Sequence, residues 1–213
     1  MHHVSAKNAL ISRMHMPAWS MKTSTQGLAF IFRHESLQGI SDHLHWPGGS
    51  SGVTLGPGYD MKERSRAQVS ADMLAIGLGK VTADEIANAI QLTGSAAEDF
   101  ADDNADLVTL TRRQQFALLR RVVPAYEVVV QRNVTTDLAQ HQFDALVSFC
   151  YNPGGSFLPV AHAINQGKIS DALHIIRVRV ITGHKRSRGL LHRRIDEVQL
   201  YLHGAYHGHV DKV

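Results

Sequence analysis

Residues 34–60 read HESLQGISDHLHWPGGSSGVTLGPGYD, and this stretch interrupts an otherwise helical chain. It is rich in glycine, serine and proline, and its only strand-like run is VTLG. Gly56 and Gly58 allow the tight backbone turns that a hairpin requires. The stretch therefore predicts a small β excursion flanked by two carboxylates, Glu35 and Asp60.

Helical patterns lie on both sides of this excursion. Ser24 or Thr25 can cap a short helix that ends near Glu35. Residues 135–155 form the clearest amphipathic pattern and predict the central core helix. Together the patterns predict an α+β fold that is mostly α, with a Gly-rich β excursion and a helical bundle.

Start and stop signals place the other helices. Capping boxes, with Glu or Gln three positions after Ser or Thr, predict helix starts at Thr82, Ser95 and Thr111. Pro124 is expected to interrupt or restart the helix that follows Thr111. The last helix is predicted at about 187–203, stopped by the glycine that follows. Its apolar face comprises Leu191, Ile195, Val198 and Leu202.

The ends of the sequence and the single cysteine allow predictions about domain limits, place of synthesis and the state of the thiol. Residues 1–20 have no period, which predicts a poorly ordered leader, and residues 21–213 predict a single domain. No signal-peptide pattern and no apolar run of roughly 18 residues is present, so we expect synthesis in the cytoplasm without a signal peptide. Cys150 lies in an apolar helical pattern, which indicates a buried free thiol.

The net charge excludes few classes of binding partner. A formal net charge of +3 and a pI near 9.1 suit nucleic acid, acidic lipid or an acidic cell-wall polymer. The basic residues cluster at 112–121 and 184–194, where solvated helix faces are the simplest interpretation. The histidines near both ends lack the acids or cysteines of a tight ligand set, so we expect no functional metal site.

Glu35 and Asp60 suit the cleavage of a glycosidic bond. Such cleavage needs one carboxylic acid to protonate the leaving oxygen and a second carboxylate to activate water or stabilise the transition state. Partial burial at a helix end would favour the protonated form of Glu35, and the Thr54 hydroxyl could hold the attacking water. An ordinary loop with a hairpin stays the alternative, because acids near loops are common.

Four motifs follow one another along residues 21–204: Glu35 at a helix end, then TLGPGYD, ALVSFCYNPGGSF and RGLLHRRIDEVQLYLHG. They resemble the motifs of the phage-type lysozymes of glycoside hydrolase family 24. The resemblance implies a lysozyme-like fold and hydrolysis of the β-1,4 bond between N-acetylmuramic acid and N-acetylglucosamine in peptidoglycan. It implies water as second substrate and no metal or organic cofactor.

Two positions depart from the family pattern. The second acid, about six residues before the Thr in the phage enzymes, is replaced by Gly48, and the His that ends the turn motif is replaced by Tyr59. This arrangement resembles the pesticin-like variant of the muramidase domain, whose Asp follows the Thr. By that resemblance the general acid, the water-positioning residue and the second carboxylate are Glu35, Thr54 and Asp60. Asp42 is the reserve candidate for the second acid.

Other side chains are candidates for sugar contacts, each with a structural alternative: His34, Trp46, Tyr59 and Asn152. The alternatives are a partly exposed neutral His, plain packing of the two aromatic rings, and capping of the core helix by the Asn. The resemblance also makes Arg194 the favoured charge partner of the catalytic Glu, ahead of its neighbour Arg193. Such an ion pair would favour the ionised Glu.

Two biological settings fit these features: a phage endolysin, and an antibacterial effector or toxin delivered by a secretion machine such as type VI. In either setting the protein would act as a monomer in the periplasm or cell wall, with peptidoglycan as its partner. An effector would also have an immunity protein, and no specific nucleic acid partner is expected. The alternative of another class is a non-catalytic module that binds the cell wall.

Overall fold

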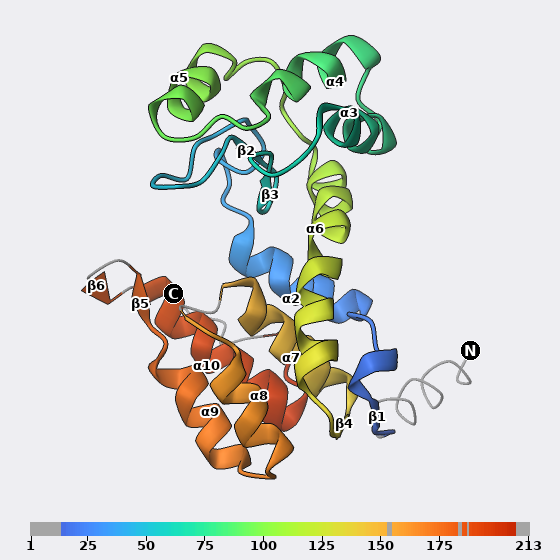
Figure 1. Ribbon diagram of the computed structural model, residues 1–213, viewed down its shortest axis with the longest axis vertical. Coiled ribbons are helices and arrows are strands. Elements are labelled where there is room, and N and C mark those ends of the chain that lie inside the picture. The colour runs from blue at the N-terminus through green and yellow to red at the C-terminus, as the bar shows by residue number, and fades with distance from the viewer. Residues whose placement is uncertain (1–13, 153–154, 183–184, 187, 208–213) are drawn as a thin grey trace. The chain divides into compact units, whose positions relative to one another are not determined.

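The computed structural model describes residues 14–152, 155–182, 185–186 and 188–207 (Figure 1). The described chain is mostly helical with short two-stranded sheets, which confirms the expected α+β, mostly α class. Its contacts divide it into two compact units. Unit 1 comprises the described parts of Met1–Ile31 and Val123–Val213, and unit 2 is Phe32–Val122.

Unit 2 contains the Gly-rich excursion and the shorter helices that follow it. Its elements are β2 (Thr54–Leu55), β3 (Tyr59–Asp60), α3 (Arg66–Ala75), α4 (Lys80–Ile86), η2 (Ala87–Ala89) and α5 (Ser95–Asp103). Helix α3 packs against α4 and η2. Ser65 caps α3, because its side chain accepts a hydrogen bond from the backbone N–H of Gln68 at 3.2 Å.

Two helices, α2 (Thr25–Glu35) and α6 (Arg112–Asn133), contribute residues to both units. The predicted cap of α2 is confirmed: Ser24 Oγ accepts from the backbone N–H of Gly27 at 2.9 Å. The predicted capping box of α6 is confirmed as well. The backbone N–H of Thr111 donates to Gln114 Oε1 at 2.9 Å, and the N–H of Gln114 donates to Thr111 Oγ1 at 3.3 Å.

The expected break at Pro124 is wrong, because α6 continues through it to Asn133. A proline inside a helix leaves the carbonyl four residues earlier without its N–H donor. Both Pro124 and Arg120, which carries that carbonyl, are exposed, so water can satisfy the group. The cost of the proline is thereby reduced enough for the helix to persist.

Two predicted capping boxes are wrong. Helix α4 begins at Lys80 after Gly79, so Thr82 lies inside its first turn rather than at its cap. Helix α5 begins at Ser95 itself, and Gly94 occupies the cap position with φ 57°. In both cases the glycine supplies the non-helical backbone conformation before the helix.

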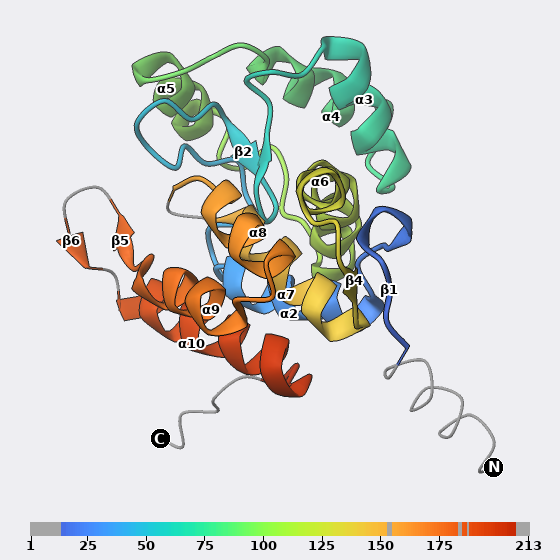
Figure 2. The same ribbon diagram turned by 60° about the horizontal axis from the view of Figure 1, so that its bottom comes forward.

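Unit 1 is built around α7 (Gln140–Tyr151). Its other elements are β1 (Met16–Pro17), η1 (Ala18–Ser20), β4 (Asp137–Leu138), α8 (Leu158–Asn165), α9 (Ile169–Val178), β5 (Ile181–Thr182), β6 (Lys185–Arg186) and α10 (Arg188–His203). Residues 143–150 of α7 are all buried, which confirms it as the central core helix. Helix α10 packs against α7 and α9, and α8 packs against α9 (Figure 1 and Figure 2).

Burial also settles the state of Cys150. Its side chain is buried, as expected. Burial raises the pKa of the Cys150 thiol far above its usual range, and the nearby Glu197 carboxylate raises it further. The thiol therefore stays protonated and is a packing group rather than a nucleophile.

Residues 16–20, which were expected to belong to a poorly ordered leader, form a short strand and a 3₁₀ turn. Met16–Pro17 pairs antiparallel with Asp137–Leu138, and Ala18 and Met21 are buried. Residues 1–13 lie outside the described residues.

The buried face of α10 differs from the expected one. Leu191 and Leu202 are 40% and 47% exposed, although they were expected inside. The buried face carries charged residues among its apolar ones: Leu190, Arg193, Arg194, Asp196, Glu197, Val198, Leu200 and Tyr201. The expectation of a solvated basic face is thus wrong for the two arginines, because they are paired inside the unit.

Candidate active site

The hairpin of β2 and β3 places two predicted site residues opposite each other. Thr54 pairs with Asp60, and Leu55 pairs with Tyr59. Gly56 and Gly58 turn the chain with φ values of 62° and 81°, which confirms the expected glycine turn. Directly opposed residues of an antiparallel pair project from the same face, so the side chains of Thr54 and Asp60 share one side of the hairpin.

The Asp60 carboxylate is tied to the backbone around it. Its Oδ2 accepts from the backbone N–H of Gly52 at 3.1 Å, and its Oδ1 accepts from the N–H of Lys62 at 2.8 Å. A Cβ on Gly52 would lie 2.6 Å from Asp60 Oδ1, so only glycine fits there. Asp60 is half-buried, and an ionised carboxylate has about four lone-pair sites, so it can still accept a hydrogen bond from water.

Thr54 is 3% exposed, and its hydroxyl donates to the carbonyl of Gly52 at 3.2 Å. Its backbone pairs with His45 in both directions, at 2.8 and 3.0 Å. The hydroxyl proton is therefore engaged, while the oxygen keeps lone pairs that can accept a hydrogen bond from water. Thr54 donates to the carbonyl of Gly52 and Asp60 accepts from its N–H, so we call Gly52 the pivot of the hairpin.

Tyr59 lies on the other face of the hairpin and is completely buried. Its hydroxyl donates to Asp72 Oδ2 at 2.6 Å, and the Arg64 guanidinium lies 4.0 Å from the centroid of its ring. Burial raises the pKa of Tyr59 well above its usual value, and the hydrogen bond to Asp72 raises it further. The geometry thus favours packing over the sugar contact that was the other interpretation.

Asp72 in turn forms an ion pair with Arg121 of α6, at the edge of this buried chain of contacts. No local pattern in the sequence points to Asp72, because its partners come from other elements. We call Tyr59, Asp72 and Arg121 the hairpin anchor. It fixes the back of the strand that carries Asp60 to α3 and α6.

Glu35, the predicted general acid, is the last residue of α2 and is half-buried, as is His34 beside it. Both belong to unit 2 with the hairpin. Trp46 is half-buried too, and its indole N–H donates to the carbonyl of Ser51 at 3.0 Å, which closes the loop before β2.

Asp42, the reserve acid, is held by its backbone rather than by its side chain. Its carbonyl accepts from the N–H of Leu110 at 2.8 Å, and its side chain is 23% exposed. One oxygen, Oδ2, lies 3.9 Å from His43 Nε2. The other, Oδ1, is buried without a hydrogen-bond partner in the part of the chain that the structure describes.

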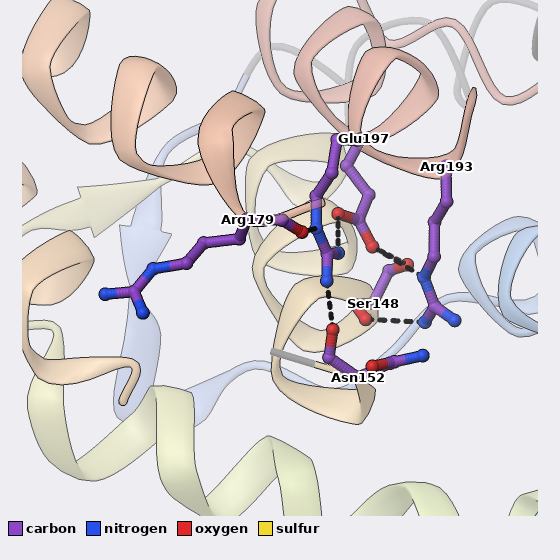
Figure 3. A network of polar contacts seen from close by, with 6 residues as sticks. Ser148, Asn152, Arg179, Arg193 and Glu197 are labelled. Carbon is purple, nitrogen blue, oxygen red and sulfur yellow. Dashed lines mark hydrogen bonds and ion pairs between the residues drawn. The ribbon is translucent and has the colours of Figure 1, made fainter. Parts of the chain in front are cut away.

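Unit 1 holds the predicted charge partner, Arg194, in a buried network. Glu197 accepts from Arg193 Nε at 2.9 Å, from Arg194 Nη1 at 2.5 Å and from Ser148 Oγ at 2.8 Å (Figure 3). Arg193 also donates to the carbonyl of Ser148 at 2.8 Å. We call Ser148, Arg193, Arg194 and Glu197 the charge network. Glu197 was not among the predicted site residues, although its spacing of three and four residues from the arginines is typical of helical ion pairs.

Arg194 has further partners within unit 1. Its Nε donates to the carbonyl of Arg179 at 2.9 Å, its Nη2 donates to the carbonyl of Asn152, and its guanidinium lies 4.7 Å from the Phe149 ring centroid. Asn152 occupies the C-cap of α7 with an exposed side chain. The helix-end interpretation of Asn152 therefore has a structural basis, and the pairing of Arg194 with Glu35 stays a prediction.

Across the described ranges, no three His, Cys, Asp or Glu side chains group as metal ligands would. Among the same residues, no helix combines the length and apolarity needed to cross a membrane.

Solved structures with similar architecture identify the fold. The endolysin from Escherichia coli O157:H7 phage FAHEc1 has a TM-score of 0.58 and 20% identity, over 88% of this chain and 97% of that one. The muramidase domain of SpmX from Asticaccaulis excentricus has a TM-score of 0.53 and 24% identity, over 85% and 97%. A P22 lysozyme mutant has a TM-score of 0.55 and 20% identity, over 85% and 99%. The chain has the lysozyme-like fold.

Sequence comparison adds a relative and a family. The endolysin of Bacillus phage PZA is 32% identical over 108 residues, which are 49% of this chain and 42% of that protein. This chain thus spans less than half the length of that relative. Residues 33–147, more than half of the chain, match the family described as Domain of unknown function (DUF8812), and the chain belongs to this family.

Proposed function

We propose that the protein is a peptidoglycan-cleaving lysozyme, an N-acetylmuramidase that hydrolyses the β-1,4 bond between N-acetylmuramic acid and N-acetylglucosamine. The observation that carries the proposal is the pairing of Thr54 with Asp60 across the hairpin, within a lysozyme-like fold. Glu35 ends a helix in the same unit. The names of the similar proteins, an endolysin, a lysozyme and a muramidase domain, support this substrate.

Each of the three residues has one role in this reaction. Glu35 donates a proton to the leaving glycosidic oxygen as the bond to the anomeric carbon breaks. Asp60 is the second carboxylate, which stabilises the positive charge that develops on the sugar ring or takes a proton from water. Thr54 accepts a hydrogen bond from the attacking water through its oxygen, because its own proton is donated to Gly52.

Asp42 is the competing choice for the second carboxylate. Both Asp60 oxygens already accept backbone N–H groups, whereas Asp42 Oδ1 has no such partner among the described residues. We favour Asp60, because it shares a face with Thr54 and Asp42 has no described contact to that pair.

Substrate contacts complete the proposal. His34 and Trp46 of unit 2 are the proposed sugar contacts, while a sugar contact of Asn152 and a pairing of Arg194 with Glu35 stay predictions of the resemblance. A pyranose ring would stack on the half-buried Trp46 ring, since the indole N–H is already engaged. The reaction needs no cofactor or metal in this scheme.

The test is loss of turbidity of purified peptidoglycan with wild type, Glu35→Gln, Asp60→Asn and Asp42→Asn. We expect a loss of at least about 100-fold for the first two variants and near wild-type rates for the third. Because Asp60 also holds the hairpin, unfolding of each variant is measured in parallel. Full activity of Glu35→Gln would contradict the mechanism. If a folded Asp42→Asn variant lost activity while Asp60→Asn stayed active, Asp42 would be the second acid.

Analysis of the products tests the bond. Borohydride reduction of the digest should convert muramic acid, and not glucosamine, to its alditol, because a muramidase releases N-acetylmuramic acid reducing ends. Reduced glucosamine, or an anhydro sugar that resists reduction, would contradict the proposed bond or the use of water.

We propose as setting either a phage endolysin or an antibacterial effector with an immunity protein as partner, acting as a monomer on the cell wall. Co-purification with the product of a neighbouring gene that blocks lysis would support the effector.

The second candidate function is a non-catalytic module that binds the cell wall. The two backbone hydrogen bonds of Asp60 favour it, because they give this acid a structural role that does not require catalysis. Sedimentation of the protein with peptidoglycan in the absence of any product would support the module.

A further inference from the structure

The first half of α6, the long yellow-green helix of Figure 1, carries arginines that the proposed reaction does not use. They border an open hollow of about 540 Å³ lined by Arg112, Arg113, Phe116, Ala117 and Arg120, which we call the arginine groove. The three arginines are exposed, while Phe116 and Ala117 are half-buried and form its floor. All five residues belong to unit 2.

Aromatic rings orient two of the guanidinium groups. The Arg112 guanidinium lies 5.4 Å from the centroid of the Phe32 ring, and that of Arg120 lies 5.4 Å from the centroid of Phe116. The two rings are 5.5 Å apart. Cation–π contact holds a guanidinium in place and leaves its N–H groups for an anion, so less entropy is lost when an anion binds.

The positive charge of the groove is not neutralised by the helix. Within the described residues, none of Arg112, Arg113 and Arg120 forms an ion pair, and the first acid of α6 is Glu127. A solvated helix face typically places opposite charges three or four residues apart, and this one does not. The amino end of α6 adds further positive potential.

A second hollow shares the lining residue Arg113 with the groove. This hollow measures about 380 Å³ and is lined by Ala75, Ile76, Gly77, Thr111, Arg113 and Gln114. Because a helix rises 1.5 Å per residue, Arg112 and Arg120 are about 12 Å apart along α6. Such a spread of charge suits a linear polyanion better than a single small anion.

We propose that the arginine groove binds a phosphodiester polymer of the bacterial cell wall, of the poly(glycerol phosphate) type. Guanidinium groups bind phosphate oxygens through paired, charge-assisted hydrogen bonds. None of the residues that line this binding site is a carboxylate of the proposed reaction, and polymer binding does not require that reaction.

Two other polyanionic surfaces fit the groove less well. Single-stranded nucleic acid binds on open aromatic faces, but Phe32 is 6% exposed and the Phe116 ring lies against Arg120. A membrane requires apolar side chains that project from the surface, whereas the apolar residues here form the floor of a hollow.

The test measures binding of the full chain to poly(glycerol phosphate) by calorimetry at about 50 and 200 mM salt. We expect Arg112→Gln, Arg113→Gln and Arg120→Gln together to weaken binding at least about tenfold and to flatten its salt dependence. The matched control changes three exposed cations of unit 1, Arg132→Gln, Lys168→Gln and Arg177→Gln, and should lose less than about threefold. Ala117→Glu, which places a carboxylate in the floor and keeps every arginine, should weaken binding as well.

Four outcomes would overturn the proposal. They are equal losses in both triple variants, tighter binding to single-stranded DNA with the same number of phosphates, binding to phosphatidylglycerol vesicles alone, and loss of hydrolysis of polymer-free peptidoglycan in the arginine variant. The last outcome would assign the groove to the reaction site. Failure of the lysozyme proposal would leave the polymer binding intact, so the two proposals are tested apart.

Discussion

The hairpin anchor and the charge network both bury polar groups, but they do so in different ways. In the anchor, a neutral phenol and one carboxylate reach Arg121, whose side chain is 38% exposed, so solvent screens the ion pair. In the charge network, the side chains of Arg193, Arg194 and Glu197 are 4%, 0% and 0% exposed. The network therefore depends on complete pairing, whereas the anchor depends on the fit of a neutral ring.

The largest effect is expected from Glu197→Gln, which leaves two buried guanidinium groups without their carboxylate. Breaking a buried ion pair from one side costs about 3–5 kcal/mol of unfolding free energy. Urea unfolding measures it, with the exposed Glu85→Gln as control, expected within about 0.5 kcal/mol. A loss below about 1 kcal/mol would show that the network is not what stabilises unit 1.

Gly52→Ala tests the packing on the side of the hairpin that carries Thr54 and Asp60. The new Cβ would lie 2.6 Å from Asp60 Oδ1 and 2.9 Å from the backbone N of Lys62, so we expect a loss of about 1–3 kcal/mol and a displaced carboxylate. Under the proposed function, hydrolysis should fall at least about tenfold.

The control is Gly79→Ala, where a Cβ would meet nothing within 4 Å and φ is −68°. It precedes α4, so its cost should stay near about 0.5 kcal/mol, with hydrolysis unchanged. Equal effects of the two alanines would contradict the role of Gly52 as the pivot.

Tyr59→Phe tests the anchor by removing only the donor to Asp72. Loss of one buried hydrogen bond that involves a charged acceptor costs about 1–2 kcal/mol. Tyr201→Phe is the matched control, because Tyr201 is also buried, at 3% exposed, and its hydroxyl has no hydrogen bond among the described contacts. Equal shifts of the unfolding midpoint in the two variants would contradict a stabilising role of the hairpin anchor.

Ionisation of a single buried tyrosine at alkaline pH gives the smallest effect. Burial raises the pKa of Tyr59 far above 10.0 and that of Tyr201 to about 12. Because the folded pKa exceeds the unfolded one, the stability is complete below pH 10 and is lost as pH rises toward the folded pKa. From pH 9 to 10.5 each tyrosine should remove about 0.8 kcal/mol, whereas guanidinium groups do not titrate there.

Unfolding of Tyr59→Phe across the same pH range checks this sign. The variant should lose about 0.8 kcal/mol less than wild type between pH 9 and 10.5. A steeper loss in the variant would mean that Tyr59 ionises more readily in the folded protein than in the unfolded chain.

Local signals predicted the elements well where the signal and its partner are close in sequence. Ser24 with Gly27, Thr111 with Gln114, and the turn at Gly56 and Gly58 each involve residues a few positions apart. Before α4 and α5 a neighbouring glycine occupies the cap position, and there the capping-box motif predicted the wrong helix start. A cap motif shows that a helix can start, and the backbone before it decides where.

By itself, the sequence determined the helical class, the glycine turn, the central core helix and the order of the candidate acids along the chain. Only the tertiary structure decided that Tyr59 is buried against Asp72, that α10 buries arginines rather than Leu191, and that Asp60 holds Gly52. The physical reason is the same in each case. A polar or charged side chain can be buried only if partners from other segments satisfy it, and hydrophobic periodicity along one helix or strand carries no information about those partners.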